Sequence, residues 1–242
     1  MVNGSGDGFL ANIGSACRSP ERIAITLGTS ASVRCVVSTP ALDPLAGAFC
    51  YRASRDTFLL GCAGSNGGNV LEWARSIFGP APTGAHPPGD LPIFLPWLNA
   101  ERSLEWNPEL RAAWHGLTSR NSAMDLSRSV MEGVVFNLAQ YVEVIERLSG
   151  RAAQQVVLSG NGFLDPAAAP LIAALVPSEV RQPRSPGLAS LRGAAVCAWR
   201  ALGRDPSAAM ERIVEEAVPI APLSIDRPRA RYAEFKKLRA RL

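Results

Sequence analysis

Asp7 has the surroundings of a catalytic base. It stands between Gly6 and Gly8, at the head of a segment that is typical of a helix. The two glycines expose the carboxylate and let a substrate approach it, so Asp7 could accept the proton of a hydroxyl that attacks a phosphorus atom. A second interpretation stays open, because an aspartate before a helix most often serves as the helix N-cap.

Three turns of small residues are candidates for binding a phosphate or a flat ring: Gly28-Thr29-Ser30, Gly67-Gly68 and Gly160-Asn161-Gly162. Without Cβ atoms in the way, the backbone N–H groups of such turns can come close to a ligand, and the hydroxyls of Thr29 and Ser30 add hydrogen-bonding groups. None of the turns is a P-loop or a full dinucleotide fingerprint. Because hairpins also use glycine and serine, each turn taken alone is better explained as a structural turn.

The segments that must position these residues indicate an α/β protein. Apolar runs predict strands at 22–26, 32–37, 48–52, 57–62, 155–158 and around 180. We expect the first four to be antiparallel in one sheet. Apolar residues at steps of three and four predict a long helix over 126–148, which Gly150 ends. Shorter helices are predicted over 9–17, 70–78, 167–175, 188–202 and from Asp205, its cap. Proline and glycine predict a loop over 79–92.

The composition favours a folded protein of the cytoplasm. Of the 242 residues, 47% are hydrophobic and 19% are charged, which is enough apolar material for a core. No apolar run approaches the ~20 residues of a membrane span, and the first residues lack the pattern of a signal peptide. The five cysteines form no C-x-x-C pair and there are two histidines, so we expect neither a disulfide framework nor a metal site built by the chain.

The end of the sequence is basic. Seven of its residues from 221 to 242 are Lys or Arg, against Asp226 and Glu234. Such a segment could contact nucleic acid or an acidic partner. We favour a solvated helix whose Tyr232, Phe235 and Leu238 pack inward, because no recognition motif accompanies the charge. We therefore expect no nucleic-acid partner and no membrane partner.

Four stretches make the chain resemble the C-terminal half of the FGGY carbohydrate kinases, in the sugar kinase–Hsp70–actin superfamily. They occur in that family's order, at 6–14, 25–30, 112–132 and 158–163. The resemblance spans residues 1–242, and the stretch at 112–132 is its most specific part. The first two stretches look most like those of gluconate kinases, and xylulose-type kinases are the second substrate class.

The resemblance implies an RNase H-like (actin-like ATPase) fold, with a mixed sheet flanked by helices. It also implies transfer of the ATP γ-phosphate to a hydroxyl of a sugar or sugar acid, assisted by Mg²⁺, with Asp7 as the base. Gly28, Thr29 and Ser30 would bind the phosphates. The residues implied for the rest of the nucleotide are Gly68, Glu72, Gly160, Asn161 and Gly162. Trp114 and Glu132 would be structural.

Such kinases have an N-terminal domain of similar length before the position of Asp7. In the family, that domain carries the first phosphate motif, the metal-positioning aspartate and most sugar contacts. We therefore expect this chain to be the nucleotide-binding half, inactive by itself, with an apolar surface that docks on the other domain or self-associates. The alternative is a non-catalytic module that binds a nucleotide or a partner.

Overall fold

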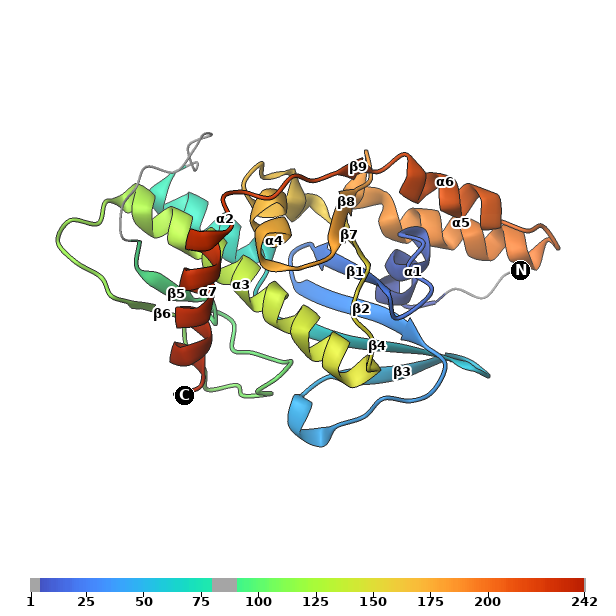
Figure 1. The fold of residues 1–242 in the computed structure, drawn as a ribbon, viewed down its shortest axis with the longest axis horizontal. Helices are drawn as coiled ribbons and strands as arrows, with labels where there is room; N and C mark the ends of the chain where they lie inside the picture. Colours follow the sequence, from blue (N-terminus) through green and yellow to red (C-terminus); the bar gives the residue numbers. More distant parts are fainter. Residues whose placement is uncertain (1–4, 80–90, 242) are drawn as a thin grey trace.

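The computed structural model describes residues 5–79 and 91–241, so most of the predicted loop at 79–92 lies outside the described residues (Figure 1). Its centre is a seven-stranded sheet in the order β3-β4-β2-β1-β7-β8-β9. The strands are β1 (Arg22–Leu27), β2 (Ala31–Val37), β3 (Phe49–Ser54), β4 (Thr57–Gly64), β7 (Gln155–Ser159), β8 (Glu179–Gln182) and β9 (Val218–Pro219). A separate two-stranded sheet pairs β5 (Ile93–Leu95) with β6 (Ala113–His115).

The large sheet is mixed, as predicted. Strands β3, β4, β2 and β1 pair antiparallel, whereas β1 pairs with β7 and β7 with β8 in parallel. Each predicted strand lies within two residues of an observed one. This arrangement, with helices on both sides, is the RNase H-like fold.

One face of the sheet carries the main apolar core. Alternate residues of β1, such as Ile23 and Ile25, pack there with α3 (Ala123–Ser149), α2 (Gly68–Phe78) and α4 (Ala168–Leu175). The long helix α3 begins with a capping box between Ser122 and Asp125 and ends at Gly150, whose φ is +66°. The predicted helix and its glycine stop are therefore confirmed.

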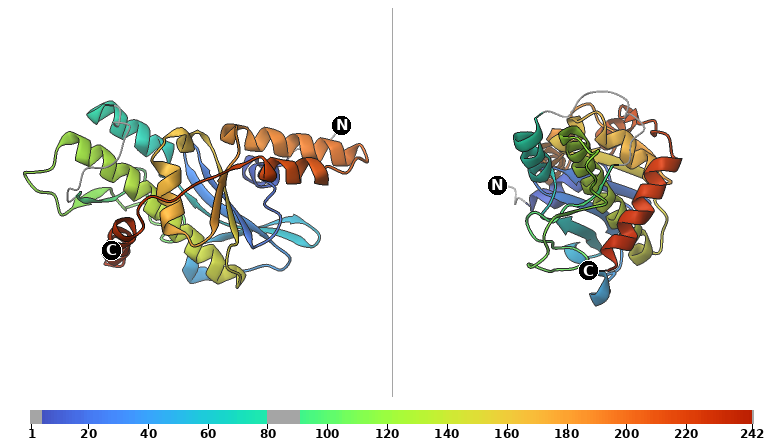
Figure 2. Two further views of the ribbon diagram at one scale, coloured as in Figure 1. Left: turned by 45° about the horizontal axis from the view of Figure 1, so that its top comes forward. Right: turned by 90° about the vertical axis from the view of Figure 1, so that its left-hand side faces the viewer.

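The opposite face is covered by α1 (Asp7–Gly14) and α5 (Ala189–Ala201), with α6 (Ser207–Glu215) beside them. Figure 2 shows α5 and α6 side by side at one end of the molecule and α7 (Asp226–Arg239) at the other. Helix α1 is shorter than predicted and ends before Cys17. Asp205 precedes the N-cap, Pro206, but its carboxylate still accepts a hydrogen bond from the Ser207 N–H at 2.9 Å.

The basic segment forms α7, and its apolar residues Tyr232, Phe235 and Leu238 are buried, as predicted. Two of its arginines are not solvated. Arg231 pairs with Glu132 at 2.6 Å, and Arg239 pairs with Glu105. Trp114 donates its indole N–H to Ser129 at 2.8 Å. Trp114 and Glu132 therefore have structural partners, as expected. No helix in the part of the chain that the structure describes is long and apolar enough to cross a membrane.

Candidate active site

The first two glycine turns pack against each other through their backbones. The N–H of Gly68 donates to the Gly28 carbonyl at 2.7 Å, and that of Asn69 donates to the Thr29 carbonyl at 3.0 Å. A Cβ at Gly67 would lie 2.5 Å from the Ser30 carbonyl carbon, and a Cβ at Gly68 would lie 2.5 Å from the Gly28 oxygen. Glycine is required at both positions because the turn after β1 sits directly on the start of α2.

The third turn joins them from the other side. Gly160 has a φ of +91°, and a Cβ there would lie 2.4 Å from the Leu27 carbonyl oxygen. A Cβ at Gly162 would lie 2.3 Å from the Leu27 Cγ. All three turns therefore meet at the end of β1. A side chain at position 162 would collide with Leu27, so the packing of Leu27 is one reason for this glycine.

The turn after β1 is open on its outer side. A Cβ at Gly28 would have the Ser30 carbonyl oxygen, 3.8 Å away, as its nearest neighbour. The side chains of Thr29 and Ser30 are exposed. Backbone N–H groups and two hydroxyls can therefore approach an anion here, and the residues present fit the phosphates of a nucleotide.

Asn161 lies within the third turn, and Glu72 lies on α2 beyond the second turn. The short helix η3 (Pro186–Leu188) contacts the third turn, because Gly160 donates its N–H to the Pro186 carbonyl at 2.9 Å. A Cβ at Gly187 would lie 2.3 Å from the Asn161 Oδ1, so the Asn161 side chain fills the space that this glycine leaves. Glu72 is exposed on α2, one turn beyond Gly68.

Asp7 is the first residue of α1 and is exposed. The N-cap is Gly6, and the Asp7 carboxylate accepts a hydrogen bond from the next backbone N–H, that of Gly8, at 2.7 Å. The N-cap interpretation of Asp7 is therefore wrong. The backbone carbonyl of Asp7 accepts a hydrogen bond from the Ser190 hydroxyl at 3.2 Å, which connects the start of α1 to the first turn of α5.

Helices α1 and α5 touch through their backbones. A Cβ at Gly14 would lie 1.9 Å from the Ala189 carbonyl oxygen, and a Cβ at Gly193 would lie 1.9 Å from the Leu10 carbonyl oxygen. Arg192 also donates its Nε–H to the Gly14 carbonyl at 3.1 Å. Since η3 leads straight into α5, this contact fixes Asp7 relative to the turn that holds Asn161.

Arg34 is a buried arginine near Asp7 that the sequence pattern did not single out. It lies on β2, and it donates from Nη1 to the Ser32 hydroxyl and from Nη2 to the Thr26 hydroxyl, both at 2.6 Å. Burial lowers the pKa of the Arg34 guanidinium to about 10, and the nearby charge of Asp7 acts in the opposite direction. A signal existed in the sequence, because Ser32 and Arg34 alternate as polar residues in an otherwise apolar strand.

A metal ion is not accommodated by these residues alone. In residues 5–79 and 91–241, no three side chains of His, Cys, Asp or Glu come together as a metal site would require. Asp7 by itself supplies one carboxylate, whereas Mg²⁺ needs several oxygen ligands. The described residues therefore do not form a Mg²⁺ site, and we derive no step through this ion.

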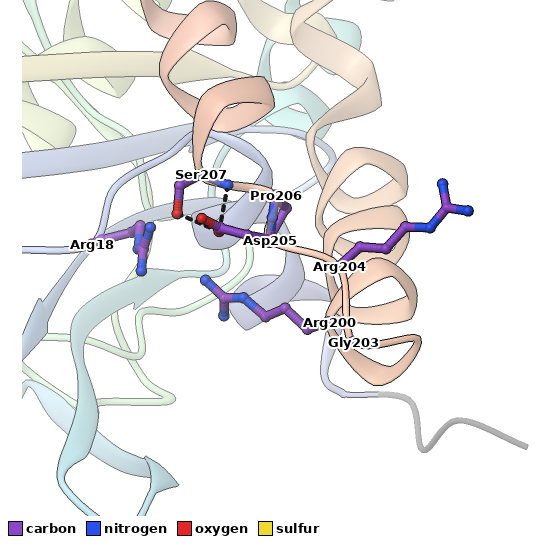
Figure 3. Close-up of a pocket in the computed structure, with 7 residues that line it drawn as sticks. All are labelled: Arg18, Arg200, Gly203, Arg204, Asp205, Pro206 and Ser207. Carbon is purple, nitrogen blue, oxygen red and sulfur yellow. Dashed lines mark hydrogen bonds between the residues drawn. The ribbon is translucent and has the colours of Figure 1, made fainter.

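Figure 3 shows a hollow of about 500 Å³ elsewhere on the surface, where the loop before α6 begins. It is lined by Arg18, Arg200, Gly203, Arg204, Asp205, Pro206 and Ser207. The Ser207 hydroxyl and N–H bond to the Asp205 carboxylate, and with Arg18 and Arg200 nearby they lower the pKa of that carboxyl. None of the predicted site residues lines this hollow, so it is separate from the three turns.

Comparison with known proteins finds carbohydrate kinases, both by a family model and by individual relatives. Residues 23–202 match the C-terminal domain of the FGGY family of carbohydrate kinases. The chain is 31% identical over 157 residues to a gluconokinase of Bacillus subtilis (strain 168), covering 57% of this chain and 31% of that protein. It is 31% identical over 173 residues to a xylulose kinase of Escherichia coli (strain K12), covering 67% and 35%.

The fold comparison agrees. A gluconate kinase from Lactobacillus acidophilus superposes with a TM-score of 0.78 and 26% identity, over 98% of this chain and 50% of the other. The chain thus spans between 31% and 50% of the length of these relatives.

Proposed function

The chain belongs to the FGGY family of carbohydrate kinases, and we propose that it is the nucleotide-binding half of a kinase that phosphorylates a sugar or sugar acid with ATP. The observation that carries the proposal is the meeting of three glycine turns at the end of β1, with Asp7 held on α1 by the α5 contact. Phosphoryl transfer depends on such positioning more than on covalent chemistry by the protein.

The nucleotide would lie along the three turns. The exposed turn of Gly28, Thr29 and Ser30 would bind the phosphates, with backbone N–H groups and two hydroxyls as donors. The remaining residues proposed for the nucleotide surround that turn, and they are Gly68, Glu72, Gly160, Asn161 and Gly162. Mg²⁺, when bound with ATP, would offset the phosphate charge; its ligands would come from the phosphates and from groups outside the described residues.

Asp7 would act on the acceptor. Its carboxylate takes the proton of the sugar hydroxyl while that oxygen forms a bond to the γ-phosphorus. The bond from phosphorus to the leaving oxygen of ADP breaks in the same transfer. Asp7 is exposed and lies at the start of a helix, where a substrate can reach it.

For the acceptor we propose a gluconate-like sugar acid first and a pentulose such as xylulose second. The gluconokinase and xylulose kinase matches support these two classes. We also propose that catalysis uses a second domain, in the same polypeptide or in another. In support, the chain covers half of a solved gluconate kinase, and α5 and its ends expose Leu188, Leu191, Trp199 and Leu202.

A coupled assay tests the function. The enzyme, purified in the form that its organism makes, is given ATP, Mg²⁺ and either gluconate, xylulose or glycerol. We expect turnover of gluconate or xylulose at about 1–100 s⁻¹, which is typical of kinases. The 242-residue chain alone should bind ATP without turning over. ATP binding with no turnover by the complete enzyme would favour the non-catalytic module instead.

A further inference from the structure

Arg34 is a buried cation with unusual partners. It is 6% exposed, and its hydrogen bonds go to the hydroxyls of Ser32 and Thr26, which are neutral. Its Nε has no hydrogen-bond partner in the part of the chain that the structure describes. A buried charge is costly unless an opposite charge is near. The carboxylate whose charge acts on Arg34 is that of Asp7.

The space around Arg34 is shaped by two glycines. A Cβ at Gly8, in the first turn of α1, would lie 3.1 Å from the Arg34 Nη1. A Cβ at Gly61, on β4, would lie 2.9 Å from the Arg34 Cγ and 2.4 Å from the Phe49 ring. The guanidinium therefore lies directly beneath the residue that follows Asp7, and any larger side chain at either glycine would press on it.

The hydroxyls that hold Arg34 continue toward the phosphate turn. Thr26 lies two residues before Gly28 and bonds to the Ser159 hydroxyl at 2.7 Å, and Ser159 precedes Gly160. Ser32 lies two residues after Ser30. The Arg34 guanidinium thus bonds to the group of hydroxyls that reaches the first and third turns, and its Nη1 also lies beside the start of α1.

From this geometry we infer that Arg34 is a positioning residue for phosphoryl transfer. It supports the first turn of α1 from below and supplies the positive charge that holds the Asp7 carboxylate in place, without touching the substrate. The inference rests on the proposed role of Asp7, and it extends that role to a residue on the neighbouring strand.

Kinetics of three variants test it. Arg34→Met keeps the unbranched stem of the side chain and removes the charged guanidinium, and it should lower kcat by about 10- to 100-fold, as misplacing a catalytic group does. The KM for ATP should stay unchanged. Arg34→Lys keeps the charge and should lie between the wild type and Arg34→Met. Arg239→Met, which removes an equally buried arginine on α7, is the control and should keep its kcat.

A double-mutant cycle shows whether Arg34 acts through Asp7. If it does, Arg34→Met should change kcat less than about 3-fold when Asp7→Asn is already present. An equal loss in both backgrounds, or a wild-type kcat for Arg34→Met, overturns the inference. If Asp7→Asn keeps its full kcat, the proposed base role fails instead, and the two failures are thereby distinguished.

Hydrogen exchange tests the positioning without any substrate. The Leu10 N–H bonds to the Gly6 carbonyl at 3.0 Å across the first turn of α1. It should exchange at least about 10-fold faster in Arg34→Met, whereas Arg34→Lys should stay near the wild type. Unchanged exchange overturns the inference even if no sugar is phosphorylated.

Gly8→Ala replaces Arg34→Met as the test if the latter fails to fold. Alanine favours the helix, so the unfolding temperature should not fall, while the new methyl group presses on Nη1 and should lower kcat. A wild-type kcat for Gly8→Ala overturns the inference in that case.

Discussion

Two buried arginines, Arg34 near Asp7 and Arg239 on α7, differ in the partners that surround them. Each is 6% exposed. Arg239 donates to both carboxylate oxygens of Glu105 and to Gln140, and it lies 5.4 Å from the centre of the Trp97 ring. Arg34 has two hydroxyls and an unpartnered Nε in the described part of the protein. Arg239 is therefore paired with a carboxylate, whereas Arg34, near Asp7, donates only to neutral hydroxyls among the described residues.

The same contrast holds for the two faces of the sheet. The face toward α3 is packed with aliphatic side chains from every central strand. The face toward α1 carries Thr26, Ser32, Arg34 and Ser159 as one hydrogen-bonded group. Hydrogen-bonded polar groups hold atoms in fixed directions, while apolar packing supplies most of the stability. We therefore expect substitutions on the α1 face to change mainly kcat, and substitutions on the α3 side to change mainly the free energy of unfolding.

Asp7→Asn should give the largest effect, and on kcat alone. Asparagine keeps the shape and can still accept the hydrogen bond from Gly8, but it cannot take a proton. We expect kcat to fall about 10²- to 10⁴-fold with little change in ATP affinity or unfolding temperature. Steady-state kinetics and calorimetric titration with ATP measure these quantities. A full kcat, or loss of ATP binding, would contradict the assignment.

Arg239→Met should show the opposite behaviour. It leaves the Glu105 carboxylate and the Asn137 Oδ1 without the arginine that donates to them, which should lower the free energy of unfolding by about 3 kcal/mol. Arg34 donates to two neutral hydroxyls and forms no ion pair among the described residues, so Arg34→Met should lower that energy by less, about 1 kcal/mol. Urea denaturation of both variants measures the difference. Equal losses would end the distinction between the two arginines.

Gly193→Ala tests the contact that connects Asp7 to the rest of the site. Its Cβ would lie 1.9 Å from a backbone oxygen of α1, so the helices must separate, at a cost of about 1–3 kcal/mol in unfolding free energy. Because Asp7 moves with α1, kcat should fall as well. Ala194→Ser, at an exposed position of the same helix, is the control and should stay within about 0.5 kcal/mol. An unchanged kcat would mean that Asp7 does not depend on α5.

Thr29→Ala should give the smallest effect. The side chain is exposed, so stability should not change, but the loss of one hydroxyl donor should weaken ATP binding by about 1 kcal/mol. Ser38→Ala, just past the opposite end of β2, is the control and should bind ATP normally. Calorimetry compares the two. Equal affinities would remove Thr29 from the phosphate turn.

Local features of the sequence predicted local features of the fold. Alternation and apolar runs located the strands, and the pattern from Leu126 onward located α3, because each depends on neighbours within a few residues. Turn residues marked where the chain reverses. The inward packing of Tyr232 and Phe235 was also predictable, since their spacing places them on one side of a helix.

Contacts between distant segments could not be predicted in this way. Nothing within Gly160-Asn161-Gly162 indicates that Leu27 will fill the space beside Gly162. The reciprocal fit of Gly14 and Gly193 depends on two helices that are far apart in the chain. Arg34 was overlooked because a charge in a strand is usually exposed, and its burial becomes evident only when β1, β4 and α1 surround it.

The position of α7 in the chain affects how the protein folds during its synthesis on the ribosome. Phe235 packs on Phe136 of α3, with ring centres 5.6 Å apart, although it follows about a hundred residues later in the chain. At a synthesis rate of roughly 5–20 residues per second, α7 is synthesised several seconds after the part of α3 on which it packs. During that interval the apolar side chains of α3 that α7 covers are accessible to chaperones on the nascent chain.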